Sequence, residues 1–326
     1  MPRESKTGTY SENEYRKEVT RIMLKIDVFS HFITKEYCKR YLNLAPEVAK
    51  TIEISRPSMT DLEIRENLLS RHPDVLQIIT MGNVPPERYV SVEDAIELSK
   101  IGNEEMAELV TKKPNLFYGA VGTLPIDDVD ASLREIDHCI NDLGLMGIQL
   151  FTTLQRESLT ELKYRPIFAR MAELDRPIWV HPAAIKQKGD CFTWPYESTV
   201  FMQNVVYAGI FEEFPRLKII IHHAGGMVPH YYERARTTMP YHQSEYLKYF
   251  YTDTALYGNT PGLMSAFDYF GADHIMFGTD APLGGPAIAN GSTGRTINAI
   301  EKMDISAEDK EKIFHDNVIK LLVTPV

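Results

Sequence analysis

The sequence predicts an α/β protein built as a single (β/α)₈ TIM barrel over residues 23–326, with residues 1–22 as an N-terminal extension. Two observations predict this fold. Eight short apolar runs recur along the chain, and longer segments with helical spacing separate them. Near-continuous apolar runs, rather than alternating ones, are typical of parallel strands that are covered on both faces. A strand and a helix repeated eight times describe a closed barrel.

The expected strands are rich in Val, Ile, Phe and Tyr. In chain order they cover residues 24–28, 76–80, 117–121, 146–151, 178–181, 217–222, 250–254 and 274–278. Apolar residues recur every three or four positions in segments 92–112, 130–143 and 165–174, and this spacing predicts amphipathic helices. Ser306, with Asp309 three residues later, predicts the N-terminus of a further helix.

A doubly wound sheet is the alternative fold. It would typically carry a glycine-rich phosphate turn after the first strand, and the residues DVFSHF at 27–32 do not form such a turn. A chain of 326 residues often folds as two domains, but α/β barrels of this length run as one. The stretch 32–75 is long for one βα unit, so we expect it to fold over the barrel mouth as part of a substrate lid.

The composition disfavours several kinds of partner. A formal net charge of -10 argues against nucleic acid, because neutralising phosphates needs a basic face. No apolar run approaches the ~20 residues that span a bilayer, and the polar N-terminus lacks the features of a secretory signal. The cysteines Cys38, Cys139 and Cys191 are scattered, which favours a reducing compartment over a disulfide framework. We therefore expect a cytoplasmic protein that acts on a small molecule.

Candidate functional residues follow the expected strands. His31, His181, His223 and Asp280 come at the ends of strands one, five, six and eight, and the carboxyl ends of barrel strands form the active site in this fold. Two His and one Asp from separate strands suit a divalent metal such as Zn²⁺ or Mn²⁺. Each residue also has a structural alternative: a lone His can cap a strand, and an Asp before Ala-Pro can form a turn. The pair at 222–223 could also straddle the barrel wall. The four residues together favour a site.

These residues lie in motifs that resemble the amidohydrolase superfamily, and specifically its branch of nonoxidative decarboxylases. That branch includes aminocarboxymuconate semialdehyde, γ-resorcylate and 5-carboxyvanillate decarboxylases. The resemblance extends from Lys25 to Leu322. The motifs that carry it are KIDVFSHF, PIWVHP, LKIIIHHAGGMVP, HIMFGTDAP and DNVIKLL. The third and fourth of these motifs are the most specific.

The resemblance implies roles for the four residues. His31, His181 and Asp280 would bind the metal, and Asp280 would also donate a proton. His223 would act as a base or would orient the substrate. His222 sits where relatives usually carry a small residue, so it is interpreted as structural or as a support to the site. The resemblance also implies a homodimer, for which the aromatic stretch 239–251 could supply an interface.

Phe29 departs from the family pattern. Relatives usually carry a His or Glu ligand at this position, and a phenylalanine side chain cannot bind a metal. Three protein ligands can still hold one divalent ion, as they do in catalytic zinc sites, and the position left open would admit bidentate binding of substrate. Asp27 cannot easily substitute, since it lies about 6–7 Å lower along the same strand. The metal could therefore be weakly bound or absent.

The leading hypothesis is metal-dependent, nonoxidative decarboxylation of an aromatic or conjugated carboxylic acid. Phe29, Arg65, Trp194 and Arg234 are the candidate substrate-binding residues: Trp194 would stack on the substrate, and either arginine would pair with a carboxylate. For each of them a structural role stays open.

The first alternative function is a metal-dependent hydrolase of a lactone or amide. The end of strand four, IQLFTT, has no lysine that could be carboxylated, and this argues against the binuclear hydrolases. The second alternative is a barrel that binds ligand without catalysis, for which the only support is Phe29.

Overall fold

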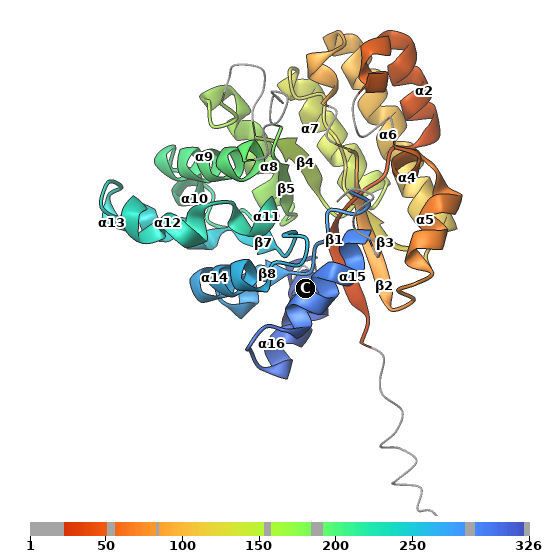
Figure 1. The fold of residues 1–326 in the computed structure, drawn as a ribbon. Helices are drawn as coiled ribbons and strands as arrows, with labels where there is room; N and C mark the ends of the chain where they lie inside the picture. Colours follow the sequence, from red (N-terminus) through yellow and green to blue (C-terminus); the bar gives the residue numbers. More distant parts are fainter. Residues whose placement is uncertain are drawn as a thin grey trace, which may run out of the picture.

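The computed structural model describes residues 23–50, 56–82, 85–152, 158–183, 192–283 and 291–322 (Figure 1). The extension expected at residues 1–22 and the thiol of Cys191 lie outside the described residues. Within them, eight parallel strands follow one another in the order expected from the apolar runs. The strands are β1 (Lys25–His31), β2 (Val75–Thr80), β3 (Phe117–Ala120), β4 (Ile148–Phe151), β5 (Ile178–His181), β6 (Ile219–Ile221), β7 (Tyr251–Asp253) and β8 (Ile275–Met276).

Backbone hydrogen bonds join the strands into a closed barrel. Strands β1 to β3 form one sheet and β4 to β8 a second, each in sequence order. At the first seam the N–H of Asp280 donates to the carbonyl of Phe29 at 2.8 Å, which joins the end of β8 to β1. At the second seam the N–H of Met146 donates to the carbonyl of Ala120 at 2.9 Å, which joins β4 to β3. The (β/α)₈ barrel predicted from the sequence is confirmed.

Helices surround the strands on the outside of the barrel (Figure 1). The α-helices are α2 (Lys35–Leu44), α4 (Pro57–Thr60), α5 (Leu62–Leu69), α6 (Val92–Lys112), α7 (Val129–Asp137), α8 (Arg165–Glu173), α9 (Thr193–Tyr207), α10 (Ile210–Glu213), α11 (His222–Gly225), α12 (Val228–Ala235), α13 (Tyr241–Glu245), α14 (Thr260–Phe270), α15 (Gly291–Glu301), α16 (Ala307–Glu311) and α17 (Asn317–Leu322). Shorter 3₁₀ or π segments are η1 (Pro46–Lys50), η2 (Pro86–Arg88), η3 (His138–Asp142), η4 (Leu162–Tyr164), η5 (Tyr246–Tyr249), η6 (Ala272–His274) and η7 (Lys312–Asp316).

The long helix α6 has the bounds that its apolar spacing predicts. Its N-cap Ser91 accepts a hydrogen bond from the N–H of Asp94, and this satisfies one of the free donors of the first turn. Ser306 caps α16 in the same way through the N–H of Asp309, as its sequence context predicts. Across the described part of the chain, no helix is both long and apolar enough to cross a membrane.

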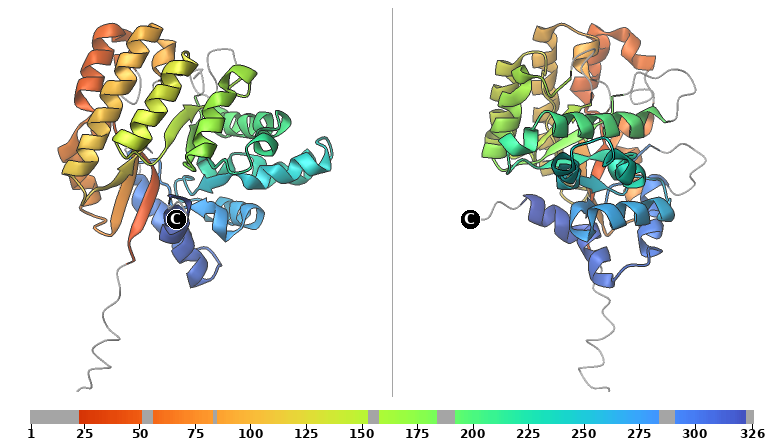
Figure 2. Two further views of the ribbon diagram at one scale, coloured as in Figure 1. Left: turned by 180° about the vertical axis from the view of Figure 1, so that it is seen from behind. Right: turned by 90° about the vertical axis from the view of Figure 1, so that its left-hand side faces the viewer.

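The stretch 32–75, expected to be a lid, does not simply cover the barrel mouth. Its first helix, α2, lies beside α6, and α7 follows on the other side of α6 (Figure 2). The side chain of Glu105 on α6 accepts hydrogen bonds from the N–H groups of Glu36 and Tyr37, at 3.0 and 2.9 Å, and so caps the N-terminus of α2. Helix α2 is therefore part of the outer layer of the barrel.

The barrel interior is a packed core below the carboxyl ends of the strands. Val28, Trp179, Ile220 and Met276 belong to one buried cluster inside the strands. The indole N–H of Trp179 donates to the carbonyl of Val28 at 2.9 Å, so the one polar atom of this large side chain is satisfied. Because the interior is filled, polar side chains gather above it, where the strands end.

Candidate metal centre and active site

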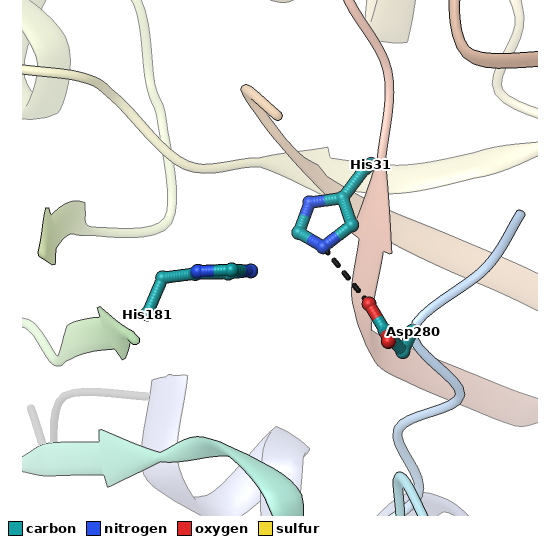
Figure 3. Close-up of side chains that lie close together, drawn as sticks. All are labelled: His31, His181 and Asp280. Atoms are coloured by element: carbon teal, nitrogen blue, oxygen red, sulfur yellow. Dashed lines mark hydrogen bonds and ion pairs between the residues drawn. The ribbon is translucent and has the colours of Figure 1, made fainter. Parts of the chain in front are cut away.

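The structure brings His31, His181 and Asp280 together at the carboxyl end of the barrel. His31 ends β1, His181 ends β5, and Asp280 follows β8 by four residues. All three side chains are buried, and one ligand atom from each lies within 4.8 Å of the others. Their side chains point toward one another across the barrel axis (Figure 3).

The hydrogen bonds of His31 leave its Nε2 atom facing Asp280. Nδ1 lies 2.8 Å from the hydroxyl oxygen of Thr80. That hydroxyl donates to the carbonyl of Ser30 at 3.2 Å, so its oxygen accepts the Nδ1–H proton. In this tautomer Nε2 carries a lone pair, and it lies 3.1 Å from Oδ1 of Asp280. Two acceptors at this distance need a proton or a metal cation between them.

His181 is also held as a neutral ligand. Its Nδ1 bonds the carbonyl of Pro182 at 2.8 Å, an outer hydrogen bond of the type that metal-binding histidines usually make. Burial, together with the neighbouring His31, His222 and His223, holds the pKa of His181 well below its ordinary value. A neutral imidazole is the form that binds a metal. The donor set of two imidazoles and one carboxylate therefore fits a divalent ion.

Asp280 is kept ionised by its neighbours. Burial raises the pKa of this carboxyl, but the hydrogen bond and charge of His31, with His223 and the Tyr257 hydroxyl, outweigh burial and lower the pKa. Tyr257 donates to Oδ2, and Nε2 of His223 lies 4.0 Å from the same oxygen. One carboxylate oxygen thus faces His31, and the other faces Tyr257 and His223.

His223 stands on a strained turn. It has a φ of 60°, in the left-handed region that non-glycine residues rarely adopt, and Ala224 follows at 54°. Asp280 has a φ of 60° and Tyr257 a φ of 48°. Strained backbone of this kind persists where the surrounding structure holds it, and it clusters at functional sites. The strain therefore marks the same side chains as the hydrogen bonds.

Phe29 and His222 form a stacked pair at the floor of the site. Their ring centroids lie 3.5 Å apart with an angle of 10° between the ring planes. Both side chains are fully buried. Nδ1 of His222 bonds Oδ2 of Asp253 at 2.7 Å, and Nε2 has no hydrogen-bond partner among the described residues. The Phe29 ring is also nearly perpendicular to the His31 ring, with ring centroids 4.8 Å apart. Phe29 thus fills space beside the ligands with apolar carbon.

The other expected substrate contacts differ in where they lie. Trp194, at the start of α9, approaches the edge of His181, with ring centroids 6.1 Å apart. Arg65 is 1% exposed and donates to the side chain of Gln77 and to the carbonyl of His31, so it is not free to pair with a substrate carboxylate. Arg234 is exposed in the last turn of α12. The structure therefore brings Trp194 to the ligands, holds Arg65 beneath them, and leaves Arg234 at the surface.

Several residues of the site were given no role by sequence reasoning. Thr80, Tyr257 and Asp253 each bond a site side chain, and Phe151 lies 5.9 Å from the ring of His181. Thr80, Phe151 and Asp253 end strands, so the same position rule that found the histidines could have indicated them. Tyr257 lies in a loop four residues after β7, and no pattern in the sequence indicates it.

A buried cluster of two His and one Asp at the carboxyl end of a (β/α)₈ barrel is the architecture of a barrel enzyme with one metal site. The chain belongs to the amidohydrolase family, whose model matches residues 93–323. This match confirms the family that the strand motifs indicated.

Similar proteins include decarboxylases. The 2-amino-3-carboxymuconate-6-semialdehyde decarboxylase of Dictyostelium discoideum is 23% identical over 92% of this chain and 91% of its own length. The gamma-resorcylate decarboxylase of Rhizobium sp. is 28% identical over 68% of this chain and 76% of its own. The solved dihydroxybenzoic acid decarboxylase of Polaromonas sp., with bound manganese and the inhibitor 2-nitroresorcinol, has a TM-score of 0.75 at 23% identity and covers 92% of this chain and 96% of that one.

Proposed function

We propose that the protein is a metal-dependent, nonoxidative decarboxylase of an aromatic or conjugated carboxylic acid. The observation that carries this proposal is the convergence of three possible metal-ligand atoms within 4.8 Å, with Nε2 of His223 placed 4.0 Å from Oδ2 of Asp280. A metal site beside a proton-transfer pair is what such a reaction needs. The similar proteins named above act on acids of this class, which supports the assignment.

His31, His181 and Asp280 would hold one divalent ion. When bound, the ion would supply a Lewis acid that anchors the substrate carboxylate and an adjacent oxygen. Both zinc and manganese accept this donor set, and the Polaromonas relative holds manganese. Phe29 offers no fourth ligand, so more positions stay open for substrate oxygens.

The residues of the chain would move the proton. The Tyr257 hydroxyl donates to Oδ2 of Asp280 and holds this carboxylate in place. Nε2 of His223 lies 4.0 Å from the same oxygen, so His223 and Asp280 are the pair that would carry the transferred proton. The pair would deliver this proton to the carbon that bears the carboxylate, which interrupts the conjugation of the substrate. The bond to the carboxylate then breaks, its electron pair restores the conjugated system, and CO₂ leaves. The proton returns to the pair from water.

Aromatic side chains support an aromatic substrate. Phe151 at the end of β4 and Trp194 at the start of α9 both approach His181 with their rings, at 5.9 and 6.1 Å. Rings on this side of the ligands would stack on a flat substrate and exclude water from it.

The structure gives less support to a hydrolase. A binuclear hydrolase needs a residue that bridges two metals, and neither Phe151 at the end of β4 nor Thr152 directly after it can do so. A hydrolase with one metal uses the same three ligands, so the choice between the two reactions depends on the assay.

The test is CO₂ release from a panel of hydroxybenzoates and conjugated acids, run beside a panel of lactones. We expect CO₂ from at least one acid, and we expect His223→Asn to lower that rate by about 10²–10⁴-fold because proton transfer is lost. Lys100→Ala, a change at an exposed residue of α6 outside the site, is the control and should leave the rate unchanged. Hydrolysis of lactones without CO₂ from any acid would refute decarboxylation.

We also propose a homodimer located in the cytoplasm. Tyr207, Tyr231 and Tyr249 are each about half exposed, and exposed tyrosines are enriched in protein interfaces. Cys38 and Cys139 are free thiols, as expected in a reducing compartment. Light scattering at micromolar concentration should give twice the chain mass, and cell fractionation should place the protein in the cytosol. A monomer mass or a membrane-bound fraction would contradict these two points.

A further inference from the structure

A chain of buried polar side chains lies beneath the two ligands His31 and Asp280. It begins at Arg65 on α5, crosses Gln77 on β2 and Asp27 on β1, and ends at Thr279, directly before Asp280. Four elements that are distant in the sequence meet in it. Each of these side chains is at most 1% exposed. Such a chain is expensive to bury unless every member is hydrogen-bonded.

The side chains are linked end to end by short hydrogen bonds. Nη1 of Arg65 donates to Oε1 of Gln77 at 2.7 Å, and Nε2 of Gln77 donates to Oδ2 of Asp27 at 3.0 Å. The hydroxyl of Thr279 donates to the same Asp27 oxygen at 2.6 Å. The backbone N–H groups of Thr279 and Phe29 donate to Oδ1 of Asp27 at 3.0 and 3.2 Å. Asp27 thus accepts from four donors and has no direct part in the metal site.

Both ends of this chain bond the backbone that carries a ligand. At one end Nη2 of Arg65 donates to the carbonyl of His31. At the other, the hydroxyl and N–H of Thr279 hold the residue before Asp280. The seam of the barrel also runs here, since the N–H of Asp280 donates to Phe29. The relative position of His31 and Asp280 therefore depends on the distance that this row of hydrogen-bonded side chains spans.

Two of these hydrogen-bonded side chains, Arg65 and Asp27, carry opposite charges. Burial lowers the pKa of Arg65 to about 10, and burial raises the pKa of Asp27 to about 6. Gln77 separates the two charges and bonds both. A buried, bridged ion pair is rarely better for stability than apolar residues of the same size. Its presence here is better explained by the geometry that it imposes on His31 and Asp280.

We propose that Arg65, Gln77, Asp27 and Thr279 are positioning residues that set the distance between His31 and Asp280 for metal binding. This role rests on the proposed metal centre. It reassigns Arg65 from the substrate carboxylate to the support of a ligand, and it connects helix α5 to the site. Outer hydrogen bonds of metal ligands typically contribute 10–100-fold to metal affinity.

Gln77→Met is the sharpest test, because the Gln77 side chain bonds Arg65 and Asp27 and touches neither ligand. Gln149→Met is the matched control: Gln149 is also a buried glutamine on a barrel strand, and among the described residues its side chain bonds only the carbonyl of Met81, at 3.1 Å. Thr279→Val is the second variant, in case Gln77→Met folds poorly. Two readouts are used: Mn²⁺ affinity by calorimetry, and the histidine side-chain NMR spectrum of metal-free protein.

We expect Gln77→Met to weaken Mn²⁺ binding by about tenfold or more and to shift the His31 ring resonances, which are assigned by their loss in His31→Gln. Gln149→Met should do neither. The double variant Gln77→Met, Thr279→Val should bind Mn²⁺ about as weakly as the weaker single variant, because both changes break one connected chain.

Unchanged affinity and unchanged His31 resonances in Gln77→Met and Thr279→Val, with only a lower unfolding temperature, would overturn the positioning role. If the loss of Mn²⁺ affinity in the double variant equals the product of the two single losses, the residues act independently and the proposed connection between them is wrong. A wild-type protein that binds no Mn²⁺ or Zn²⁺ would instead refute the metal centre, and the His31 resonances would still decide whether these residues position that ligand.

Discussion

Phe29 limits the proposed metal site to three protein ligands. Its ring lies flat against His222 and nearly perpendicular to His31, and it occupies the position where the family resemblance expects a ligand. The ring adds no charge, so one carboxylate and two neutral imidazoles remain to balance a divalent ion. Such a site keeps a net positive charge, which favours an anionic substrate. It should also bind its metal less tightly than a site with four ligands.

Replacing Phe29 by Glu tests this account. The new carboxylate lies next to His31, and we expect it to tighten Mn²⁺ binding by about tenfold or more, or about 1.4 kcal/mol. Phe29→Leu is the control, because it removes the stack on His222 and adds no ligand. Calorimetry measures both. If Phe29→Glu binds Mn²⁺ no more tightly than Phe29→Leu does, the side chain at position 29 is not directed at the metal.

Asp27 gives a pH dependence at the same scale. Burial raises its pKa from an ordinary 3.8 to about 6 in the folded protein. The folded state then holds a proton that the unfolded state has lost between these pH values, so stability falls as pH rises through this window. The contribution is about 3 kcal/mol once both states are ionised. Asp27→Asn cannot titrate. Urea unfolding of the two proteins should show wild type losing about this much relative to the variant between pH 4 and 7, and parallel curves would contradict it.

Among the elements, helix α9 and the glycine-rich turn after β6 position the site together. The turn carries His223, and α9 begins with Trp194. They meet at Gly226, which has a φ of 63° and whose added Cβ would lie 2.6 Å from the carbonyl of Pro195. The hydroxyl of Thr199 accepts a hydrogen bond from the N–H of Met227 at 2.8 Å and so ties the helix to the turn. A side chain at position 226 would separate the two.

Gly226→Ala should therefore lower the free energy of unfolding more than an ordinary glycine-to-alanine change at a positive φ does. Gly144→Ala is the matched control, since Gly144 has a φ of 68° and no atom lies within 4 Å of its added Cβ. We expect the control to lose about 1–2 kcal/mol from backbone strain alone. Gly226→Ala should lose clearly more and should also lower the catalytic rate, because His223 moves. Equal losses by urea unfolding, with an unchanged rate, would contradict this role of the contact.

For the whole molecule, the features that repeat along the chain were those that the sequence could predict. Near-continuous apolar runs indicate buried parallel strands, and the strand ends indicate the active-site face. His31, His181 and Asp280 were found in this way, because their position depends only on which strand they follow. The boundaries of the strands differ from the expected ones by a few residues, since a strand ends where its hydrogen bonds end and not where the apolar run ends.

The side-chain connections could not be predicted in the same way. The bond between Thr279 and Asp27 joins residues 252 positions apart, and it depends on how β1 and β8 meet when the barrel closes. Arg65 was assigned to the substrate because it is a cation in an expected lid. Its burial depends on how α5 docks, and no periodic pattern in the sequence reports this. The bond from Tyr257 to Asp280 could not be predicted either, because Tyr257 lies in a loop whose path no periodic pattern reports.

The claim on which the rest depends is that His31, His181 and Asp280 hold one divalent ion. The most direct test is the metal content of the protein, measured by mass spectrometry after equilibrium dialysis against Mn²⁺ or Zn²⁺, with the metal content of the dialysis buffer subtracted. We predict one ion per chain for the wild type and none for His181→Ala, whose folding is checked by circular dichroism. A wild-type protein without metal, or a His181→Ala variant that retains the same ion, would contradict the account.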